Sequence, residues 1–270
     1  MISKAIKFVK EQLTAEPSFV FVGPPASGKT VYFTCAMDRI KKLLSQSPAG
    51  GLSLQTEDKK TLKRHNSSIS AMKKGGWPPK TVAAHKLYYL LTKKVKVGGR
   101  FHLADIDTRL IYHDYPGEVF EKAFGDENAD PHWEKEAKNL KTDLQTAHGV
   151  FLVIDTPKLH NGEDEAYNLQ LFDLLKFIEN ETKVKRICVI FTKRDLFRGD
   201  PEFDPKQHLR LLYDDAWSFL ERSKAAFFFV TAVSNPGSDL DGNLVPPKGF
   251  ETSQSENLIE PLAWALKLPI

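Results

Sequence analysis

The chain has 270 residues, of which 41% are hydrophobic and 27% are charged, and its formal net charge is +3. This length accommodates one large α/β domain or two small ones, and the composition is that of an ordinary globular protein. The net charge is too small to predict binding to nucleic acid, although an excess of Lys and Arg between residues 45 and 100 would suit an acidic partner or simply form a solvated surface.

The two cysteines, Cys35 and Cys188, fall on a predicted helix and a predicted strand. Two isolated thiols suit a reducing cytosol and form neither a disulfide framework nor a metal cluster. No apolar run reaches the roughly 18 residues of a membrane span, and the first residues lack the apolar core of a signal peptide. We therefore expect a cytoplasmic protein without a transmembrane segment.

Residues 1–17 predict an amphipathic helix, because their apolar side chains recur at helical spacing. This pattern favours packing against the domain over binding to a lipid surface. A buried strand is expected at 19–22 and a helix from about Gly28 to Leu44. The chain therefore opens with a strand, a loop and a helix.

Residues 45–80 are polar, basic and rich in Ser, Gly and Pro. They predict one helix, from Thr56 to Lys74, which Gly75-Gly76 would end. The segment holds too few large apolar residues for a core of its own. We interpret it as an insertion into a single domain that spans residues 1–270.

Residues 85–113 predict two long strands joined at Gly98-Gly99, with a bulge between Asp105 and Asp107 where the alternation of apolar residues breaks. From Pro131 onwards, helices and strands alternate. Strands are expected at 150–154, 187–191 and 226–230. Helices are expected at 131–147, 165–180, 205–222 and 256–266; a long loop is expected at 234–253, and Pro261 either interrupts the last helix or marks its first turn. This order predicts an α/β fold with a mainly parallel central sheet, an antiparallel edge strand and helices on both faces.

The segment Gly23-Pro-Pro-Ala-Ser-Gly-Lys-Thr30 fits the phosphate-loop pattern G-x-x-x-x-G-K-[ST] between a strand and a helix. Backbone N–H groups of such a loop point at phosphate oxygens. We expect this role for Gly23, Ala26, Ser27 and Gly28. Lys29 is expected to neutralise the charge of the β- and γ-phosphates, and the hydroxyl of Thr30 is expected to ligate Mg²⁺.

A D-x-x-G pattern, Asp114-Tyr-Pro-Gly117, ends a predicted strand. A carboxylate at that place can hold Mg²⁺ through water, and the N–H of Gly117 can reach a γ-phosphate. The same pattern at Asp239-Leu-Asp-Gly242 follows no strand, so we interpret it as a turn.

Two further motifs follow later strands. Thr192-Lys193-Arg194-Asp195 fits [NT]-K-x-D, and the carboxylate of Asp195 can accept both N1–H and N2–H₂ of guanine, a pair that adenine cannot offer. The stem of Lys193 would lie along the base. In Thr231-Ala232-Val233, a backbone N–H can donate to guanine O6.

These four motifs occur in order, each at the carboxyl end of a strand, where open α/β sheets bind their ligands. From Phe19 to Val233 the sequence therefore resembles the Ras-like GTPases of the translation-factor-related P-loop class. The resemblance implies the roles just described for Lys29, Thr30, Asp114, Thr192, Lys193, Asp195 and Ala232. The segments GGWPPKT, DYPGE and IEPLAWAL are also similar to bacterial double-GTPase-type proteins linked to conflict and defence systems.

Spacing does not fix the switch I threonine that would close over Mg²⁺ and the γ-phosphate. We favour Thr81, with Thr56 and Thr61 as rivals. Glu118 stands where family members often carry a water-positioning Gln; its carboxylate can polarise the attacking water, but beside a γ-phosphate it needs a compensating cation. The loop prolines lie close to where an arginine finger would pass. We therefore expect slow hydrolysis, with Lys29, Glu118 and Thr81 as the catalytic residues.

The sequence thus predicts a regulatory switch that binds GTP and GDP and hydrolyses GTP with Mg²⁺. Residues 45–81 and 114–130 are expected to change order with the γ-phosphate and to contact a protein effector or activator. Nucleic acid is not expected as a partner. Two alternatives stay open: a P-loop ATPase or small-molecule kinase, and a nucleotide-locked interaction module without turnover.

Overall fold

The computed structural model describes most of the chain. The described residues are 17–46, 52–96, 103–125, 130–161, 165–184, 186–197, 203–212, 214–233, 236–238, 244–252 and 255–266. The helix predicted at 1–17 and the turn predicted at Gly98-Gly99 lie outside them. Within the described ranges, no helix is both long and apolar enough to cross a membrane.

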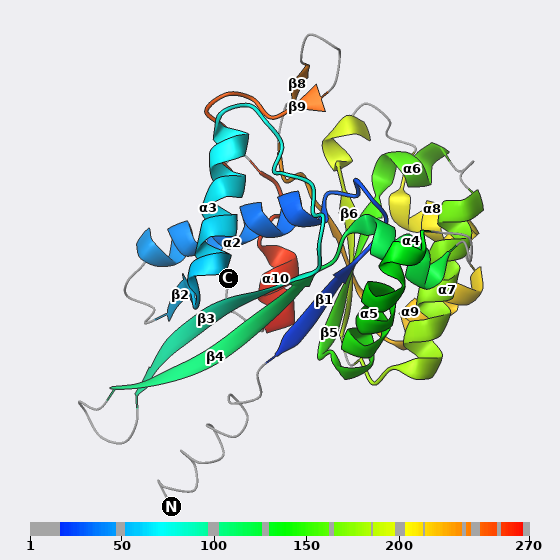
Figure 1. Ribbon diagram of the computed structural model, residues 1–270, viewed down its shortest axis with the longest axis horizontal. Coiled ribbons are helices and arrows are strands. Elements are labelled where there is room, and N and C mark those ends of the chain that lie inside the picture. The colour runs from blue at the N-terminus through cyan, green and yellow to red at the C-terminus, as the bar shows by residue number, and fades with distance from the viewer. Residues whose placement is uncertain are drawn as a thin grey trace, which may run out of the picture.

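A seven-stranded sheet in the order β2-β3-β4-β1-β5-β6-β7 forms the centre of the protein (Figure 1). Its strands are β1 (Ser18–Val22), β2 (Leu52–Thr56), β3 (His85–Lys96), β4 (Leu103–Asp114), β5 (Gly149–Asp155), β6 (Ile187–Thr192) and β7 (Ala226–Phe229). Strand β1 pairs in parallel with β4 and β5, and β6 and β7 continue the parallel arrangement. Strand β3 runs antiparallel to both of its neighbours.

Helices cover both faces of this sheet (Figure 1). They are α2 (Lys29–Gln46), α3 (Lys59–Lys73), α4 (Gly117–Phe124), α5 (Glu134–Thr146), α6 (Thr156–Asn161), α7 (Glu165–Glu181), α8 (Pro205–Leu212), α9 (Asp214–Arg222) and α10 (Glu260–Leu266). Two 3-10 turns, η2 (Pro131–Trp133) and η3 (Arg194–Phe197), and a small ribbon, β8 (Gly237–Ser238) with β9 (Leu244–Val245), complete the described part. The predicted α/β fold, with a mainly parallel central sheet and helices on both faces, is confirmed.

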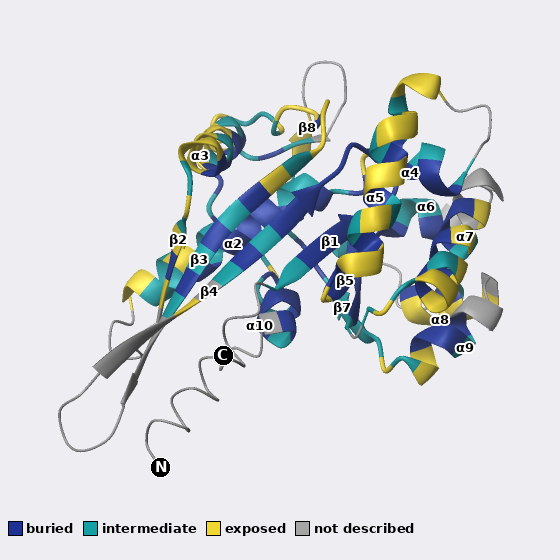
Figure 2. Cartoon of the chain, turned by 60° about the horizontal axis from the view of Figure 1, so that its bottom comes forward, coloured by how far each residue is buried: buried dark blue, intermediate teal, exposed yellow. Residues whose placement is uncertain are grey.

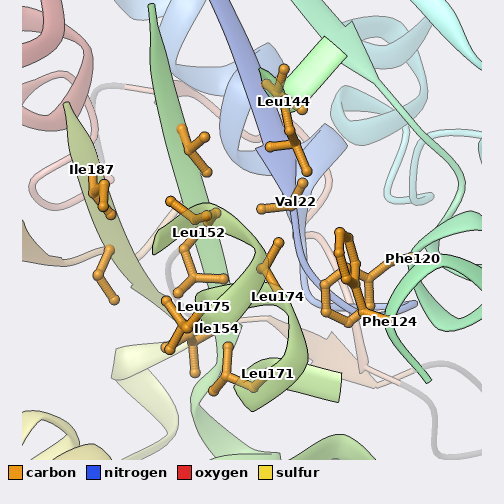
Figure 3. Packing of buried hydrophobic residues seen from close by; sticks show 14 of the residues in the cluster. Val22, Phe120, Phe124, Leu144, Leu152, Ile154, Leu171, Leu174, Leu175 and Ile187 are labelled. Carbon is orange, nitrogen blue, oxygen red and sulfur yellow. The ribbon is translucent and has the colours of Figure 1, made fainter. Parts of the chain in front are cut away.

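Successive residues of each central strand supply two separate cores, because side chains alternate between the faces of a sheet. On one face, Leu152 and Ile154 of β5 point toward α7, where Leu171, Leu174 and Leu175 meet them (Figure 3). These side chains are at most 1% exposed. Helices α4, α5, α8 and α9 bury their apolar residues in the same cluster.

The opposite face is rich in aromatic side chains. The rings of Phe21 and Phe151 stack with their centroids 4.3 Å apart, and Phe33 of α2 stacks on Tyr112 of β4 at 3.6 Å. Helices α2, α3 and α10 cover this cluster, and α3 carries many exposed residues on its outer side (Figure 2). Two cores of this size hold β1, and the loop that follows it, at the centre of the molecule.

The segment 45–80 is more ordered than the sequence indicated. The predicted helix is confirmed as α3, which begins at a cap where Thr61 N–H donates to Asp58 Oδ1 at 2.8 Å. Before it lies β2, which the sequence analysis missed and which pairs antiparallel with β3. The sequence of this strand, LSLQT, has only two apolar residues, a pattern too short to be recognised without its partner.

Other details differ from expectation. The bulge predicted between Asp105 and Asp107 is wrong, because β3 and β4 pair residue for residue from His85 opposite Asp114 to Lys96 opposite Leu103. Helix α6 was missed, since its six residues follow β5 directly and are too few for a helical period. The helix predicted at 205–222 is described as α8 and α9, with residue 213 outside the described part. Pro261 lies in the first turn of α10, which confirms that alternative.

Candidate nucleotide-binding site

The phosphate-loop segment connects β1 to α2 and adopts a conformation that most side chains would prevent. Gly23 has φ +152°, and a Cβ there would lie 2.2 Å from the carbonyl oxygen of Val153. Gly28 has φ +87°. Ala26 also has a positive φ, 59°, which an L-residue with a Cβ adopts rarely. The loop is thus held in a strained shape by the strand and helix at its ends, as is common at ligand-binding loops.

Lys29 lies beneath this loop and is almost fully buried, at 7% exposed. Its Nζ donates to the carbonyl oxygens of Gly23 at 2.7 Å and Pro24 at 2.8 Å, and to Ser27 Oγ at 3.4 Å. Burial lowers the pKa of Lys29 to about 8, although nearby carboxylates, chiefly that of Asp114, act to raise this pKa. A cation held by three loop oxygens is placed to transfer its hydrogen bonds to an anion bound by the same loop.

Thr30, Thr81 and Asp114 converge beside the loop. Thr30 Oγ1 lies 3.2 Å from Thr81 Oγ1 and 3.3 Å from Asp114 Oδ1, and Thr81 Oγ1 lies 3.2 Å from Asp114 Oδ2. Neighbouring ligands of an octahedral Mg²⁺ are about 3.0 Å apart, given metal–oxygen distances of about 2.1 Å. Each of these pairs has about the spacing of neighbouring Mg²⁺ ligands, so Thr30 and Thr81 could ligate the ion while Asp114 holds it directly or through water.

The rival threonines lie elsewhere. Thr61 Oγ1 donates to Asp58 Oδ2 at 2.6 Å and accepts from Tyr88 N–H at 3.1 Å, so its hydroxyl serves the start of α3. Thr56 is the last residue of β2. Among the three candidates, Thr81 is the one that the structure places beside Thr30.

Two residues of this cluster were missed in the sequence. Arg64 of α3 donates through Nη2 to Asp114 Oδ2 at 2.6 Å and to Thr81 Oγ1 at 2.8 Å. Tyr112 Oη donates to Asp114 Oδ1 at 3.1 Å. Tyr112 precedes Asp114 by two residues on the same strand, so a shared face could have indicated it. Arg64 gives no such signal, because its position depends on how α3 packs.

The segment after Asp114 packs directly against the phosphate loop. A Cβ on Gly117 would lie only 2.3 Å from Cα of Pro25. The next residue, Glu118, forms an ion pair with Lys80, which immediately precedes Thr81. Burial is the largest single influence and acts to raise the pKa of Glu118, but the hydrogen bond and charge of Lys80, the backbone N–H of Glu118 and the charge of Lys29 together outweigh it and hold the pKa below its ordinary value. Lys80 thus offsets part of the charge of Glu118.

Replacement of Gly117 by alanine is expected to destabilise the protein by about 2 kcal/mol, because the new methyl group would overlap backbone atoms that cannot move aside cheaply. Thermal unfolding followed by circular dichroism measures this effect. Gly237→Ala is the matched control, since a Cβ at Gly237 would meet no atom within 4 Å. Equal melting temperatures for the two variants would contradict the close approach.

The residues predicted to recognise a base divide into two groups. Asp195, at the start of η3, and Ala232 both line the cavity described below. Thr192 also lines the cavity and supports the phosphate loop: its Oγ1 donates to the carbonyl oxygens of Ser27 at 2.8 Å and Ile154 at 3.0 Å. The backbone N–H of Thr231 donates to the carbonyl of Glu256 at 3.2 Å, and the residue is 1% exposed, so this N–H is already used within the fold.

Lys193 has a positive φ of 58° and pairs through Nζ with Asp155 Oδ2 at 2.7 Å. Asp155 ends β5 and is 3% exposed. This contact holds the aliphatic part of the Lys193 side chain at the edge of the cavity, where a bound base could lie along that side chain.

A cavity of about 610 Å³ joins these groups. Its lining includes Ala26, Ser27, Gly28, Lys29, Thr30, Trp77, Thr81, Gly117, Glu118, Lys193, Asp195 and Ala232. The volume falls within the range of small-molecule sites. Trp77, 42% exposed, forms part of the wall together with Pro78 and Pro79. The cavity therefore extends from the phosphate loop to the ends of β6 and β7.

Sheet order, the loop between β1 and α2, and a cavity at the carboxyl ends of the strands define an α/β protein whose candidate site lies where open α/β sheets bind their ligands. No family model matches the sequence, and no curated protein matches it either. Five of the solved structures that resemble the chain are between 10% and 16% identical to it, with TM-scores between 0.38 and 0.44.

Three of these structures illustrate the range. The bacterial selenocysteine-specific elongation factor EF-Sec is 16% identical (TM-score 0.42), and the match covers 94% of this chain but 29% of that one. The Ski7 GTPase-like domain of S. cerevisiae, bound to GDP and inorganic phosphate, is 14% identical (TM-score 0.44; 98% and 53% covered). Toc33 from Arabidopsis thaliana, in complex with Mg²⁺ and GMPPNP, is 11% identical (TM-score 0.41; 99% and 91% covered). Likenesses this remote carry no argument about function, which rests on the site itself.

Proposed function

We propose that this protein binds GTP and GDP with Mg²⁺ and hydrolyses GTP slowly, as a regulatory switch. One observation carries the proposal: the phosphate-loop residues and Asp195 line the same cavity. Lys29 and the loop amides would hold the phosphates at one end, while Asp195 would accept from the base at the other. The proposed ligand therefore needs both a phosphate chain and a guanine.

The residues around the loop are suited to phosphoryl transfer, which needs positioning and charge stabilisation. Thr30, Thr81 and Asp114 would hold Mg²⁺, which when bound neutralises charge on phosphate oxygens. Glu118 would orient the attacking water, since its Oε2 is buried without a hydrogen-bond partner in the structure while Lys80 holds the carboxylate. The charge of Glu118 near a γ-phosphate is the reason that we propose slow turnover.

The two alternatives make different demands. A P-loop ATPase or kinase would need no carboxylate at Asp195, and a nucleotide-locked module would bind GTP without turnover.

The further proposals are cytoplasmic location, membership of the double-GTPase-type proteins, and an effector or activator that contacts residues 45–81 and 114–130. The identity of the bound base is the first point to test, because a preference for guanine over adenine distinguishes the proposed GTPase from the ATPase.

GDP with Mg²⁺ is expected to raise the melting temperature, whereas ADP with Mg²⁺ should leave it nearly unchanged. Ligand at 100 times its Kd stabilises a protein by about 2.7 kcal/mol, which for a chain of this size corresponds to a shift of about 5–10 °C. Differential scanning fluorimetry of the full chain with each nucleotide checks this. A larger shift with ADP would support the ATPase instead, and single-turnover measurement of phosphate release then separates a hydrolase from a locked module.

A further inference from the structure

Arg64 donates hydrogen bonds to two of the oxygen atoms that could ligate a metal ion at this site. Its Nη2 donates to Asp114 Oδ2 at 2.6 Å and to Thr81 Oγ1 at 2.8 Å. The side chain of Asp114 is 0% exposed and that of Arg64 is 22% exposed. The charge of a carboxylate removed from water is compensated by hydrogen-bond donors, by a cationic side chain or by a metal ion. In this structure the cationic side chain is Arg64.

In its present position, Arg64 competes with Mg²⁺ for Thr81 and Asp114. The Thr81 hydroxyl accepts from Arg64, donates to Asp114 Oδ2 at 3.2 Å and lies 3.2 Å from Thr30 Oγ1. A hydroxyl that ligates a metal must direct a lone pair at it, and the guanidinium occupies one of the two lone pairs of Thr81 Oγ1. Two cations that share one carboxylate at this distance also repel each other strongly.

We propose that Arg64 is a built-in counter-ion that competes with Mg²⁺ for Asp114 and Thr81, so that metal binding releases Arg64 and couples α3 to the state of the site. The inference rests on the proposed function, because Mg²⁺ would arrive with the nucleotide phosphates. It concerns one positioning residue of this chain, contributed by the segment 45–80.

The contacts of the Arg64 side chain would allow it to leave Asp114 and Thr81 without unfolding α3. Its Nε is buried without a hydrogen-bond partner, so the guanidinium is held at one end only. The helix keeps other anchors when that end moves: Asp58 caps its first turn, and Met72 is fully buried, with its sulfur 3.8 Å from that of Cys35. Release of Arg64 therefore changes one contact of α3 without removing the packing that keeps the helix folded.

Helix α3 also carries charge on its outer side. Lys60 and Lys63 are exposed there, close in sequence to Arg64. Arg64 on the inner side of α3 would move when Mg²⁺ binds, and the outer side of α3 is basic. The helix would therefore link the occupancy of the site to a surface that an acidic partner could contact.

The test measures the Mg²⁺ concentration at which GDP release from the full-length protein slows to half its metal-free rate. Arg64→Gln, which removes the charge, is expected to lower this midpoint about ten-fold, and Arg64→Lys, which keeps it, should stay near the wild-type value. Lys63→Gln on the same helix is the matched control and should not move the midpoint. In nucleotide-free protein with EDTA, Arg64→Gln is expected to lower the melting temperature, and this loss should shrink in an Asp114→Asn background.

An unchanged or higher midpoint for Arg64→Gln, in a protein whose GDP release responds to Mg²⁺, overturns the competition. A midpoint that falls equally for Lys63→Gln overturns it as well, because a general loss of positive charge would then explain the effect. Failure of the wild-type protein to bind GDP under any metal condition is a different result, which refutes the proposed function and this inference with it.

Discussion

Replacement of Lys29 by alanine is expected to weaken GTP binding by about 100- to 1,000-fold while leaving the fold intact. Charge-assisted hydrogen bonds contribute roughly 1.5–3 kcal/mol each, and an ammonium beneath the loop can make two of them to phosphate oxygens. The hydrogen bonds of Lys29 in the structure go to loop atoms alone, and Lys29 belongs to neither hydrophobic cluster. Titration with a fluorescent GTP analogue and circular dichroism measure the two effects.

Lys41→Ala is the control, because Lys41 is an exposed residue of the same helix. The pKa of about 8 adds a second signature. In the free protein Lys29 is protonated below that pH and neutral above it, so GTP affinity of the wild type should fall as pH rises past about 8. Normal binding by Lys29→Ala, or a variant that unfolds, would refute the assignment.

Replacement of Asp195 by asparagine is expected to lower GTP affinity by about 100-fold and to shift preference toward xanthine nucleotides. The carboxylate would accept two protons from guanine, whereas an amide can accept only one and would place a donor opposite the other. The same amide can donate to the 2-oxo group of xanthine. Competition among GTP, XTP and ATP for one fluorescent nucleotide measures the change.

The matched control is Asp173→Asn, an exposed aspartate on α7. It should leave all three affinities unaltered. Unchanged GTP affinity in Asp195→Asn would mean that the base lies elsewhere in the cavity, even if nucleotide still binds through the loop. Because Lys29→Ala tests the phosphate end and Asp195→Asn tests the base end, the two results separate a misplaced base from a protein that binds no nucleotide.

The sequence was sufficient for the parts of the site that follow strands. In a parallel sheet the carboxyl ends of neighbouring strands meet, so motifs after β1, β4 and β6 had to lie together once those strands were recognised. The same logic placed Asp195 and Ala232 on one cavity. Thr81 was favoured on a different ground, because it lies just before the first of the two long strands.

The remaining features depend on packing between distant segments. Arg64 reaches Asp114 across 50 residues, and no local pattern encodes the angle at which α3 lies. The edge strand β2 is recognisable only through its pairing with β3. Thr231 followed the right strand, but its N–H is already used in a bridge to Glu256. Local periodicity cannot report such long-range contacts.

The hydroxyl of Thr192 has a mechanical consequence. It ties the carbonyl of Ser27, in the phosphate loop, to the strand end that carries Lys193 and Asp195. A displacement at either end is therefore transmitted to the other through one short side chain. Substitutions at Lys29 and Asp195 are consequently not independent perturbations, and their effects on affinity should depart from simple addition. In the proposed function, the phosphate end and the base end of the cavity are therefore mechanically linked through Thr192.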